Sequence, residues 1–308
     1  MNMNKIAMGV VLYNPDDKKR LQEAMQSFSK QDIKIYVYDN STIDINVQMP
    51  SEVTYITENK NAGIAHALNV IMSNAEKDGY EWVITMDQDS ILPVNSVSIY
   101  QKYLNVRDVA IICPQVIDKR RKYMHLSTNR GVEYIDFCIT SASCTSIKIW
   151  KELGGFDEWL FIDLVDNEYC KRVISSGYKI LRINSLILNQ EFGKITPKNK
   201  YVQAFWYKIA DVLHNQNFGK LSYKKNVSAM RVYYTNRNII YVNRKLKKYG
   251  RTAYENYHCK GYLGFCLFFN LPSVLRAKRK IDVIKAIIRG TKDGSRAKVN
   301  EWIAPIKS

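Results

Sequence analysis

Short apolar runs alternate with amphipathic stretches along the first two thirds of the chain. The runs are rich in Ile, Val and Tyr and predict β-strands, because β-branched and aromatic side chains fit a buried sheet. They lie at residues 5–12, 33–38, 53–57, 82–86, 109–113 and 178–183. Apolar residues with helical spacing predict helices over residues 16–30, 64–75 and 165–176. Strands that alternate with helices indicate an α/β fold with a parallel sheet.

Polar residues stand where the chain leaves several of these strands. Asn14, Asp39 and Asp87 follow predicted strands closely, and Asn61 lies at the mouth of a predicted helix. Ligands of open α/β sheets bind beyond the carboxyl ends of the strands. The pattern therefore predicts that one crevice collects all four side chains.

Charge is distributed unevenly along the 308 residues, which carry a net charge of +17. Residues 1–193 hold 21 basic and 24 acidic side chains, whereas residues 194–308 hold 25 and 5, so the net charges are −3 and +20. We expect a near-neutral domain over residues 1–200 and a basic helical region over residues 201–308. The basic region indicates a polyanionic partner, either an anionic membrane or a nucleic acid.

The six cysteines lie mostly in apolar runs and form no C-x-x-C pair, so no zinc site is expected. Reduced, buried thiols fit a cytoplasmic protein. An N-terminal apolar stretch of the secretory type is not found, so no signal peptide is expected. No pair of the four histidines has the spacing of metal ligands.

Two carboxylates follow the buried strand 82–86 in the sequence Asp87-Gln88-Asp89. Such a pair can converge on a hard divalent cation, and Mg²⁺ and Mn²⁺ prefer oxygen ligands that come partly from phosphates. The alternative is a solvated acidic turn without a ligand. The position at the end of a strand favours the metal site.

A second acidic cluster is interleaved with apolar residues over residues 154–168. The apolar neighbours must be buried, and burial raises the pKa of a carboxyl group, as a general base at neutral pH requires. The alternative is an acidic helix start, because carboxylates near a helix N-terminus favour its dipole.

Together these motifs resemble the inverting family-2 glycosyltransferases with the GT-A fold. The resemblance covers most of the chain and rests on the order of Tyr13-Asn14, Asp39-Asn40-Ser41, residues 59–65 with Asn69, Asp87-Gln88-Asp89, residues 154–158, and Asp166 with Glu168. Residues 82–90, 161–166 and 231–238 are similar to the bacterial rhamnosyltransferase-like branch. The resemblance implies a Rossmann-like, mixed and mainly parallel sheet with flanking helices and a basic helical C-terminal extension.

The resemblance also implies a donor-binding pocket for a nucleotide diphosphate sugar. Asp39 would contact the base or the ribose of the nucleotide. Asn61 and Gly63 would border the same pocket, into which the entry loop with Asn14 also leads. Asp87 would lie near the ribose and the metal.

Metal and acid–base roles follow from the same resemblance. Asp89 would be the chief ligand of Mn²⁺ or Mg²⁺, beside Asp87. Asp166 would be the general base, supported by Asp163 and Glu168. Asp163 is also the competing candidate for the base, because residues three apart share one face of a helix.

One position departs from the family pattern. The family often has a histidine, then two residues and a glycine, where this chain has Gln190-Glu191-Phe192-Gly193. An amide oxygen is a weaker metal ligand than imidazole. We therefore expect either a metal held more loosely with Gln190 as third ligand, or Glu191 in its place.

The basic region contains a second kind of signal. Residues 261–275 are apolar but shorter than the roughly 20 residues that a spanning helix needs. Residues 276–289 carry six basic residues and one acidic residue, and the apolar residues on one helical face are Ala277, Ile281, Ile284 and Ile288. This pattern is typical of an interfacial helix, and the alternative is a helix packed on the first domain.

The resemblance and these observations together predict a metal-dependent enzyme that moves a sugar from a nucleotide diphosphate sugar to a hydroxyl of a glycan or lipid-linked oligosaccharide in surface polysaccharide synthesis. The resemblance implies L-rhamnose as the first choice of sugar. Galactosyl or glucosyl transfer is the alternative within the fold. A nucleotidyltransferase would need a Gly-rich loop after the first strand, where this chain has Tyr-Asn-Pro. A basic nucleic-acid-binding protein leaves the acidic clusters unexplained, so no nucleic-acid partner is expected. The predicted location is cytoplasmic, on the inner face of the cell membrane.

Overall fold

The computed structural model describes residues 5–43, 45, 52–121, 124–193 and 195–306. The chain divides into two compact units, which are described separately. Unit 1 comprises residues 1–117, 126–190 and 304–308, and unit 2 comprises residues 118–125 and 191–303.

Unit 1 is built on an eight-stranded sheet. The strands are β1 (Ile6–Leu12), β2 (Ile35–Asp39), β3 (Val53–Thr57), β4 (Trp82–Asp87), β5 (Val109–Ile117), β6 (Val132–Ile135), β7 (Ser143–Ser146) and β8 (Lys179–Asn189). Their order across the sheet is β3-β2-β1-β4-β7-β5-β8-β6. Pairs that involve β6 or β7 are antiparallel and the others are parallel. The predicted mixed, mainly parallel sheet is confirmed.

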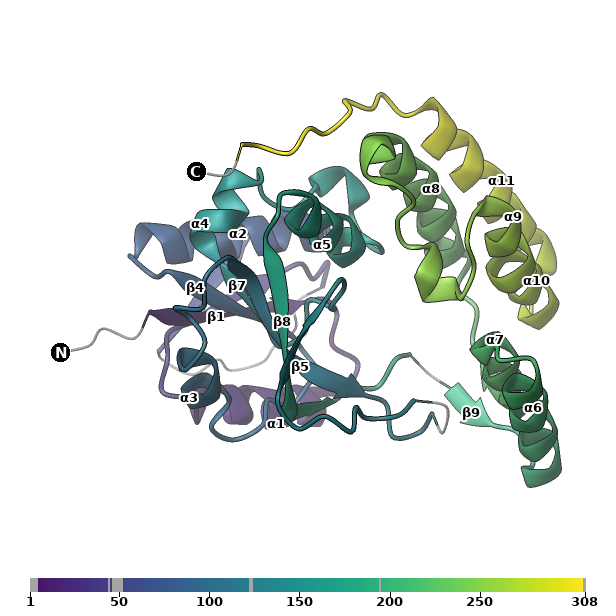
Figure 1. The fold of residues 1–308 in the computed structure, drawn as a ribbon, viewed down its shortest axis with the longest axis horizontal. Helices are drawn as coiled ribbons and strands as arrows, with labels where there is room; N and C mark the ends of the chain where they lie inside the picture. Colours follow the sequence, from purple (N-terminus) through teal and green to yellow (C-terminus); the bar gives the residue numbers. More distant parts are fainter. Residues whose placement is uncertain (1–4, 44, 46–51, 122–123, 194, 307–308) are drawn as a thin grey trace. The chain divides into compact units, whose positions relative to one another are not determined.

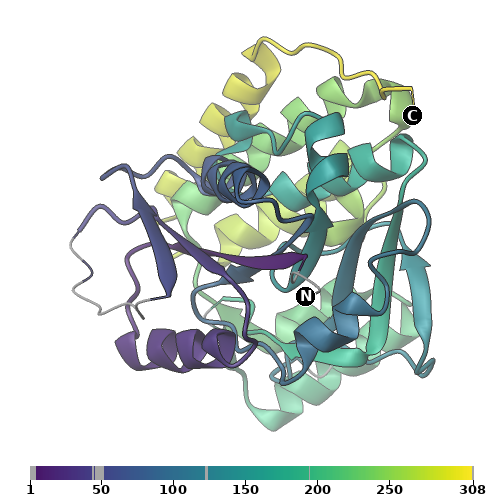
Figure 2. The same ribbon diagram turned by 90° about the vertical axis from the view of Figure 1, so that its left-hand side faces the viewer.

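Helices cover both faces of this sheet. They are α1 (Lys18–Ser29), α2 (Ile64–Lys77), α3 (Ser96–Gln101), α4 (Ile147–Glu152), the short 3₁₀-helix η1 (Glu158–Leu160) and α5 (Val165–Ser175). Helices α2, α4 and α5 lie on one face, and α1 and α3 lie on the other (Figure 1). The rotated view shows α1 and α2 on opposite sides of β1 (Figure 2). All seven residues of β1 are consequently buried, which explains its unbroken apolar sequence.

Unit 2 consists mainly of helices. The longer segments are α6 (Lys200–Val212), α7 (Gln216–Gly219), α8 (Ala229–Lys245), α9 (Tyr262–Phe265), the π-helix η5 (Cys266–Asn270), α10 (Leu271–Arg276) and α11 (Lys280–Arg296), with a small sheet of β9 (Ile195–Pro197) and β10 (Tyr223–Lys225). Helix α11 packs closely on α8. A Cβ atom on Gly290 would lie 2.4 Å from the carbonyl oxygen of Tyr233, so only glycine permits this approach. Throughout the described ranges, no helix combines the length and the apolar character needed to cross a lipid bilayer.

Candidate active site

The register of the sheet brings two predicted acids to neighbouring strand ends. Leu12 of β1 pairs with Asp39 of β2, and Val11 pairs with Asp87 of β4. Both carboxylates therefore flank the end of β1, at the edge where ligands of parallel sheets bind. The structure places these two predicted residues in one region.

Gln88 explains why an amide stands between the two acids of the Asp-Gln-Asp motif. Its Oε1 accepts a hydrogen bond from the backbone N–H of Tyr13 at 2.8 Å, and its Nε2 donates to the carbonyl oxygen of Tyr13 at 3.2 Å. The side chain therefore fixes the turn after β4 to the loop after β1. This role was not predicted, because the partner lies 75 residues away in the sequence.

Asn14 connects the loops that follow β1 and β2. Its side-chain Oδ1 accepts from the backbone N–H of Thr42 at 3.0 Å, and its own N–H donates to Oγ of Ser41 at 2.8 Å. Asn14 adopts a left-handed backbone with φ 38°, a conformation that asparagine tolerates better than most residues. Its structural contribution is to order the entrance of the predicted donor pocket.

Asp39 is almost fully buried at the end of β2. Its Oδ1 accepts from the backbone N–H of Ser41 at 2.8 Å, and its Oδ2 accepts from the hydroxyl of Tyr55. These two bonds fix the orientation of the carboxylate. Each oxygen keeps a further lone pair, so the group can still accept from a ribose hydroxyl or a base.

Asn40 fixes the loop that contains the predicted residues Asn61 and Gly63 beside the end of β2. Its Nδ2 donates to the carbonyl oxygen of Gly63 at 3.0 Å, and its Oδ1 accepts from the N–H of Ala62 at 3.0 Å. Asn61 closes the loop by accepting from the N–H of Gly63 at 3.0 Å. Hydrogen bonds thus join the loops of Asn14, Asp39 and Asn61. Gln88 ties the turn after Asp87 to the same loops, and the crevice itself stays a prediction.

Gly63 links this crevice to the second acidic cluster. It has a positive φ of 90°, and a Cβ atom at this position would lie 2.7 Å from Cδ2 of Phe161. The next residue, Ile64, donates its N–H to the carbonyl oxygen of Phe161 at 2.7 Å. The start of α2 is therefore in direct contact with the segment that leads to Asp166.

Backbone strain is concentrated in that segment. Phe161, Asp163 and Leu164 have φ values of 57°, 67° and 62°. Each such conformation costs about 1–3 kcal/mol in a residue other than glycine, and strained residues cluster at functional sites. Asp163 also precedes α5, so the expectation that it shares a helix face with Asp166 is wrong.

Asp166 lies in the first turn of α5, where its Oδ1 accepts from the N–H of Asn167 at 2.9 Å. Burial raises the pKa of this carboxyl group to about 7, and the nearby carboxylate of Asp163 acts in the same direction. The hydrogen bond from Asn167 opposes them by stabilising the carboxylate. The side chain nevertheless keeps partial access to solvent. A carboxyl group with this pKa suits general-base chemistry at neutral pH.

Glu168 has a different position from Asp166. It is fully buried, and its two carboxylate oxygens accept from Nε and a terminal nitrogen of Arg172, both at 2.7 Å. Arg172 also donates to the carbonyl oxygens of Leu153 and Gly155, each at 2.6 Å. The pair holds the loop before η1 against α5, so Glu168 supports the site through the fold rather than by touching a substrate.

Asn69 of α2 completes this support. Its Oδ1 accepts from the N–H of Phe156 at 2.8 Å and from Nε1 of Trp150 at 3.1 Å. Its Nδ2 donates to the carbonyl oxygen of Phe156 at 2.9 Å. The Gly-Gly-Phe-Asp-Glu stretch is therefore fastened to both α2 and α5.

The predicted metal ligands lie at the ends of β4 and β8. Gln190 Nε2 donates to Oδ2 of Asp87, while the buried Oε1 of Gln190 has no hydrogen-bond partner among the described residues. The side chain of Asp89 is exposed, and its backbone carbonyl accepts from Nε of Arg20 at 2.8 Å. An unpaired amide oxygen beside a carboxylate fits an oxygen-liganded divalent ion.

Two further observations qualify this fit. Glu191, the other predicted ligand, forms an ion pair with Arg120 at 2.8 Å, so Gln190 is the residue that reaches Asp87. Within the described part of the chain, no three His, Cys, Asp or Glu side chains are grouped to hold a metal. The carboxylate of Asp87 and the amide oxygen of Gln190 are oxygen donors, which fit an ion that also takes oxygen ligands from a bound diphosphate.

Part of the chain matches a known family of proteins. Residues 9–154, just under half of the chain, match the model of the family described as Glycosyl transferase family 2. The dTDP-rhamnosyl transferase RfbF of Shigella flexneri is 27% identical over 195 residues, which are 58% of this chain and 65% of that protein. The match therefore spans less than two thirds of the length of this relative.

Solved structures extend the comparison of the fold. The mannosyltransferase PcManGT from Pyrobaculum calidifontis, in complex with GDP-Man and Mn²⁺, has a TM-score of 0.51 at 14% identity, covering 96% of this chain and 76% of that one. S. aureus TarS has a TM-score of 0.50 at 12% identity, covering 93% and 55%. The predicted GT-A-type fold is thereby confirmed.

Proposed function

We propose that this protein transfers a sugar, L-rhamnose as the first choice, from a nucleotide diphosphate sugar to a hydroxyl of a glycan or lipid-linked oligosaccharide, with inversion at the anomeric carbon. The observation that carries the proposal is the hydrogen-bonded set of strand-end loops. It joins Asp39 and Asp87 to the loop of Gly63, which contacts the segment before Asp166. The acids proposed to bind the donor and the carboxyl group proposed as the base thus lie on connected segments, which supports the proposal.

Each group has a distinct task in this proposal. Asp39 and Asn61 bind the nucleoside, and Asp87, Asp89 and Gln190 would hold Mn²⁺ or Mg²⁺. A bound divalent ion offsets the charge that develops on the leaving diphosphate. Asp166 takes the proton from the acceptor hydroxyl while its oxygen attacks the anomeric carbon, and the nucleoside diphosphate departs from the opposite face.

The donor is chosen on the similarity to a dTDP-rhamnosyl transferase, and galactosyl or glucosyl transfer is the alternative. The purified protein with Mn²⁺ is expected to hydrolyse dTDP-rhamnose faster than UDP-galactose or UDP-glucose in a donor panel. Faster hydrolysis of a UDP-hexose would replace rhamnose by that sugar. Hydrolysis of none of them, with acceptor glycan present or absent, would refute glycosyl transfer.

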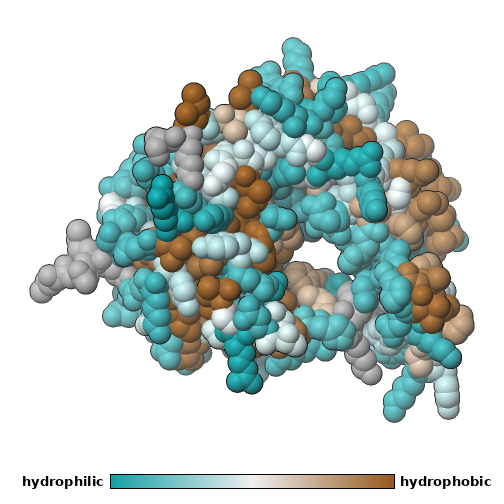
Figure 3. All heavy atoms as spheres, in the orientation of Figure 1, coloured by the Kyte–Doolittle hydropathy of each residue, from teal (hydrophilic) through white to brown (hydrophobic). Residues whose placement is uncertain are grey.

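We also propose that unit 2 attaches the enzyme to the cytoplasmic face of an anionic membrane, where surface polysaccharides begin. Helix α11 packs on α8 with one face, which includes Val283 and Ala286. The isoleucines Ile281, Ile284 and Ile288 on its remaining surface are 68, 43 and 61% exposed. Exposed leucines also recur at every fourth position from α9 to α10, at Leu263, Leu267, Leu271 and Leu275. Apolar side chains gather over these helices at the right of Figure 3.

Removal of positive charge beside this apolar surface is expected to release the protein from membranes. Each basic residue near an anionic surface contributes about 1 kcal/mol of binding. The fourfold variant with Arg276, Lys278, Arg279 and Lys280 replaced by Gln should therefore dissociate from anionic liposomes in a flotation assay, while Lys18→Gln with Lys19→Gln in α1 should not. Absence of flotation by the unaltered protein would refute the membrane proposal.

A further inference from the structure

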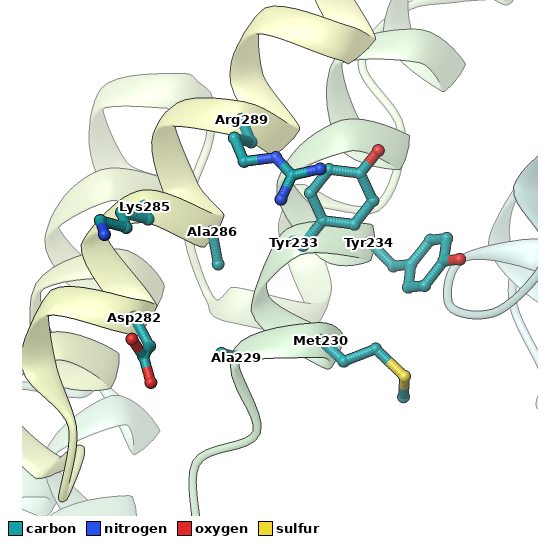
Figure 4. A pocket seen from close by; sticks show the side chains of 8 residues that line it. All are labelled: Ala229, Met230, Tyr233, Tyr234, Asp282, Lys285, Ala286 and Arg289. Atoms are coloured by element: carbon teal, nitrogen blue, oxygen red, sulfur yellow. The ribbon is translucent and has the colours of Figure 1, made fainter.

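A pocket of about 410 Å³ lies within unit 2, between the first turns of α8 and the middle of α11. Its lining residues are Ala229, Met230, Tyr233, Tyr234, Asp282, Lys285, Ala286 and Arg289. Arg289 lies beside the ring of Tyr233, and Asp282 and Lys285 stand on the α11 side (Figure 4). The proposed transfer reaction assigns no role to this pocket.

Positive charge dominates the polar groups of the pocket. The guanidinium of Arg289 lies 5.8 Å from the ring centroid of Tyr233, which holds it over the pocket. Lys285 forms no ion pair with any described residue. The one acid among the lining residues, Asp282, forms an ion pair with Arg279 at 2.8 Å.

The N-terminus of α8 adds a partial positive charge to the pocket. Ala229 and Met230 form the first turn of a 17-residue helix, whose N-terminus carries a partial positive charge. Ser228 caps the helix by accepting from the N–H of Arg231, so the start of the helix is well defined. An anionic group is the ligand that a helix N-terminus beside Lys285 and Arg289 favours.

Close packing of α11 on α8 forms one wall of the pocket. A Cβ atom on Gly294 would lie 2.4 Å from the carbonyl oxygen of Arg237, and a Cβ atom on Gly290 would lie 2.4 Å from that of Tyr233. At both glycines α11 therefore contacts the α8 backbone directly. The hydroxyl of Tyr233 also donates to Asp293 at 2.8 Å. These contacts hold the ring of Tyr233 and the backbone of α11 beside one another.

We propose that this pocket binds the phosphate group of a membrane-anchored acceptor carrier. The inference rests on the proposed function, because it names the part of the lipid-linked acceptor that unit 2 recognises. Arg289 and Lys285 bind the phosphate, and Ala229 and Ala286 contact the carbon atom bonded to the phosphate oxygen. The exposed Ile281, Ile284 and Ile288 follow one another at about one turn along the same helix, and they contact the lipid chain.

The test uses the full-length protein and vesicles of phosphatidylcholine doped with phosphatidic acid, which exposes a phosphomonoester. Vesicles doped with phosphatidylserine to the same surface charge serve as reference. The unaltered protein is expected to bind the phosphatidic acid vesicles about tenfold more tightly, the size of one charge-assisted hydrogen bond. The double variant Lys285→Gln with Arg289→Gln should lose this preference.

A matched variant separates the pocket from general charge. Lys292→Gln with Arg296→Gln removes one lysine and one arginine from exposed positions of the same helix outside the pocket, and it should keep the preference. Equal loss in both variants, or no preference in the unaltered protein, would overturn the proposal. If soluble glycerol 3-phosphate competed as strongly as phosphatidic acid, the ligand of the pocket would be a free phosphate ester. That result would overturn the proposal of a membrane-anchored ligand. Donor hydrolysis by the unaltered protein without vesicles tests the proposed reaction separately.

Discussion

Replacement of Asp89 by alanine is expected to reduce sugar transfer by at least about a hundredfold, because several kcal/mol of charge stabilisation at the leaving diphosphate depends on the metal. Excess EDTA should have the same effect on the unaltered protein, and Mn²⁺ should restore its activity. Glu23→Ala, which removes an exposed acid of α1, is the control and should retain activity. The measurement is the initial rate of transfer at saturating donor.

Calorimetry makes this prediction sharper. Because the proposed ligands are two carboxylates and one amide oxygen, Mn²⁺ should bind weakly to the protein alone and more tightly when a nucleoside diphosphate adds its oxygens. Asp89→Ala should remove this enhancement. Full activity in excess EDTA would refute the metal assignment.

Asp166→Asn is expected to lower turnover by about 10²–10⁴-fold, the usual contribution of a general base, with donor affinity in the presence of Mn²⁺ close to normal. The substitution keeps the shape of the side chain and removes its basicity. Asp163→Asn should cost less turnover, or should weaken binding instead. Turnover and donor affinity are measured on the same preparations.

The pH dependence follows from the raised pKa of Asp166. With a pKa of about 7, the group is protonated and inactive as a base in acid, so kcat/KM should rise with pH and level off above about 7. The residual activity of Asp166→Asn should lack this step. A normal rate in this variant, or a loss of donor binding as severe as in Asp89→Ala, would move the role of base to Asp163.

Stability provides an independent readout of the same group. The folded pKa lies above the unfolded value of 3.8, so the folded state binds the proton more tightly. The free energy of unfolding should therefore decrease as pH rises from about 4 to 7. The stabilisation from the bound proton is complete below about pH 4 and is gone above about pH 7. Asp166→Asn should be more stable than the unaltered protein at neutral pH but not below pH 4, which thermal unfolding at both pH values would reveal.

Strands β1, β2, β4 and β5 could be predicted from the sequence because they are buried along all or most of their length and read as continuous apolar runs. The two antiparallel strands could not. Strand β7 is Ser-Cys-Thr-Ser, which is fully buried although its side chains are small and mostly polar. Strand β6 alternates exposed and half-buried residues over only four positions, so its pattern is too short to distinguish from a loop.

The acids of the site could be predicted because they follow strands or interrupt apolar runs. The amides and the arginine that position them could not, since their partners are distant in sequence. Gln88 binds Tyr13, and Asn40 binds Gly63, but neither pairing leaves a periodic signal. The left-handed backbone that removes Asp163 from the helix is likewise set by the surrounding contacts and not by the local sequence.

The path of the chain between its units limits how the protein can be shortened. The chain crosses from one unit to the other at 117–118, 125–126, 190–191 and 303–304. Residues 118–125 depend on later parts of the chain: the N–H of Phe192 donates to the buried Asp118, and the hydroxyl of Tyr223 donates to the carbonyl oxygen of Arg120. A protein ended near residue 200 would keep the first of these partners and lose the second. An autonomous catalytic fragment would instead need a short linker that joins Ile117 directly to Leu126.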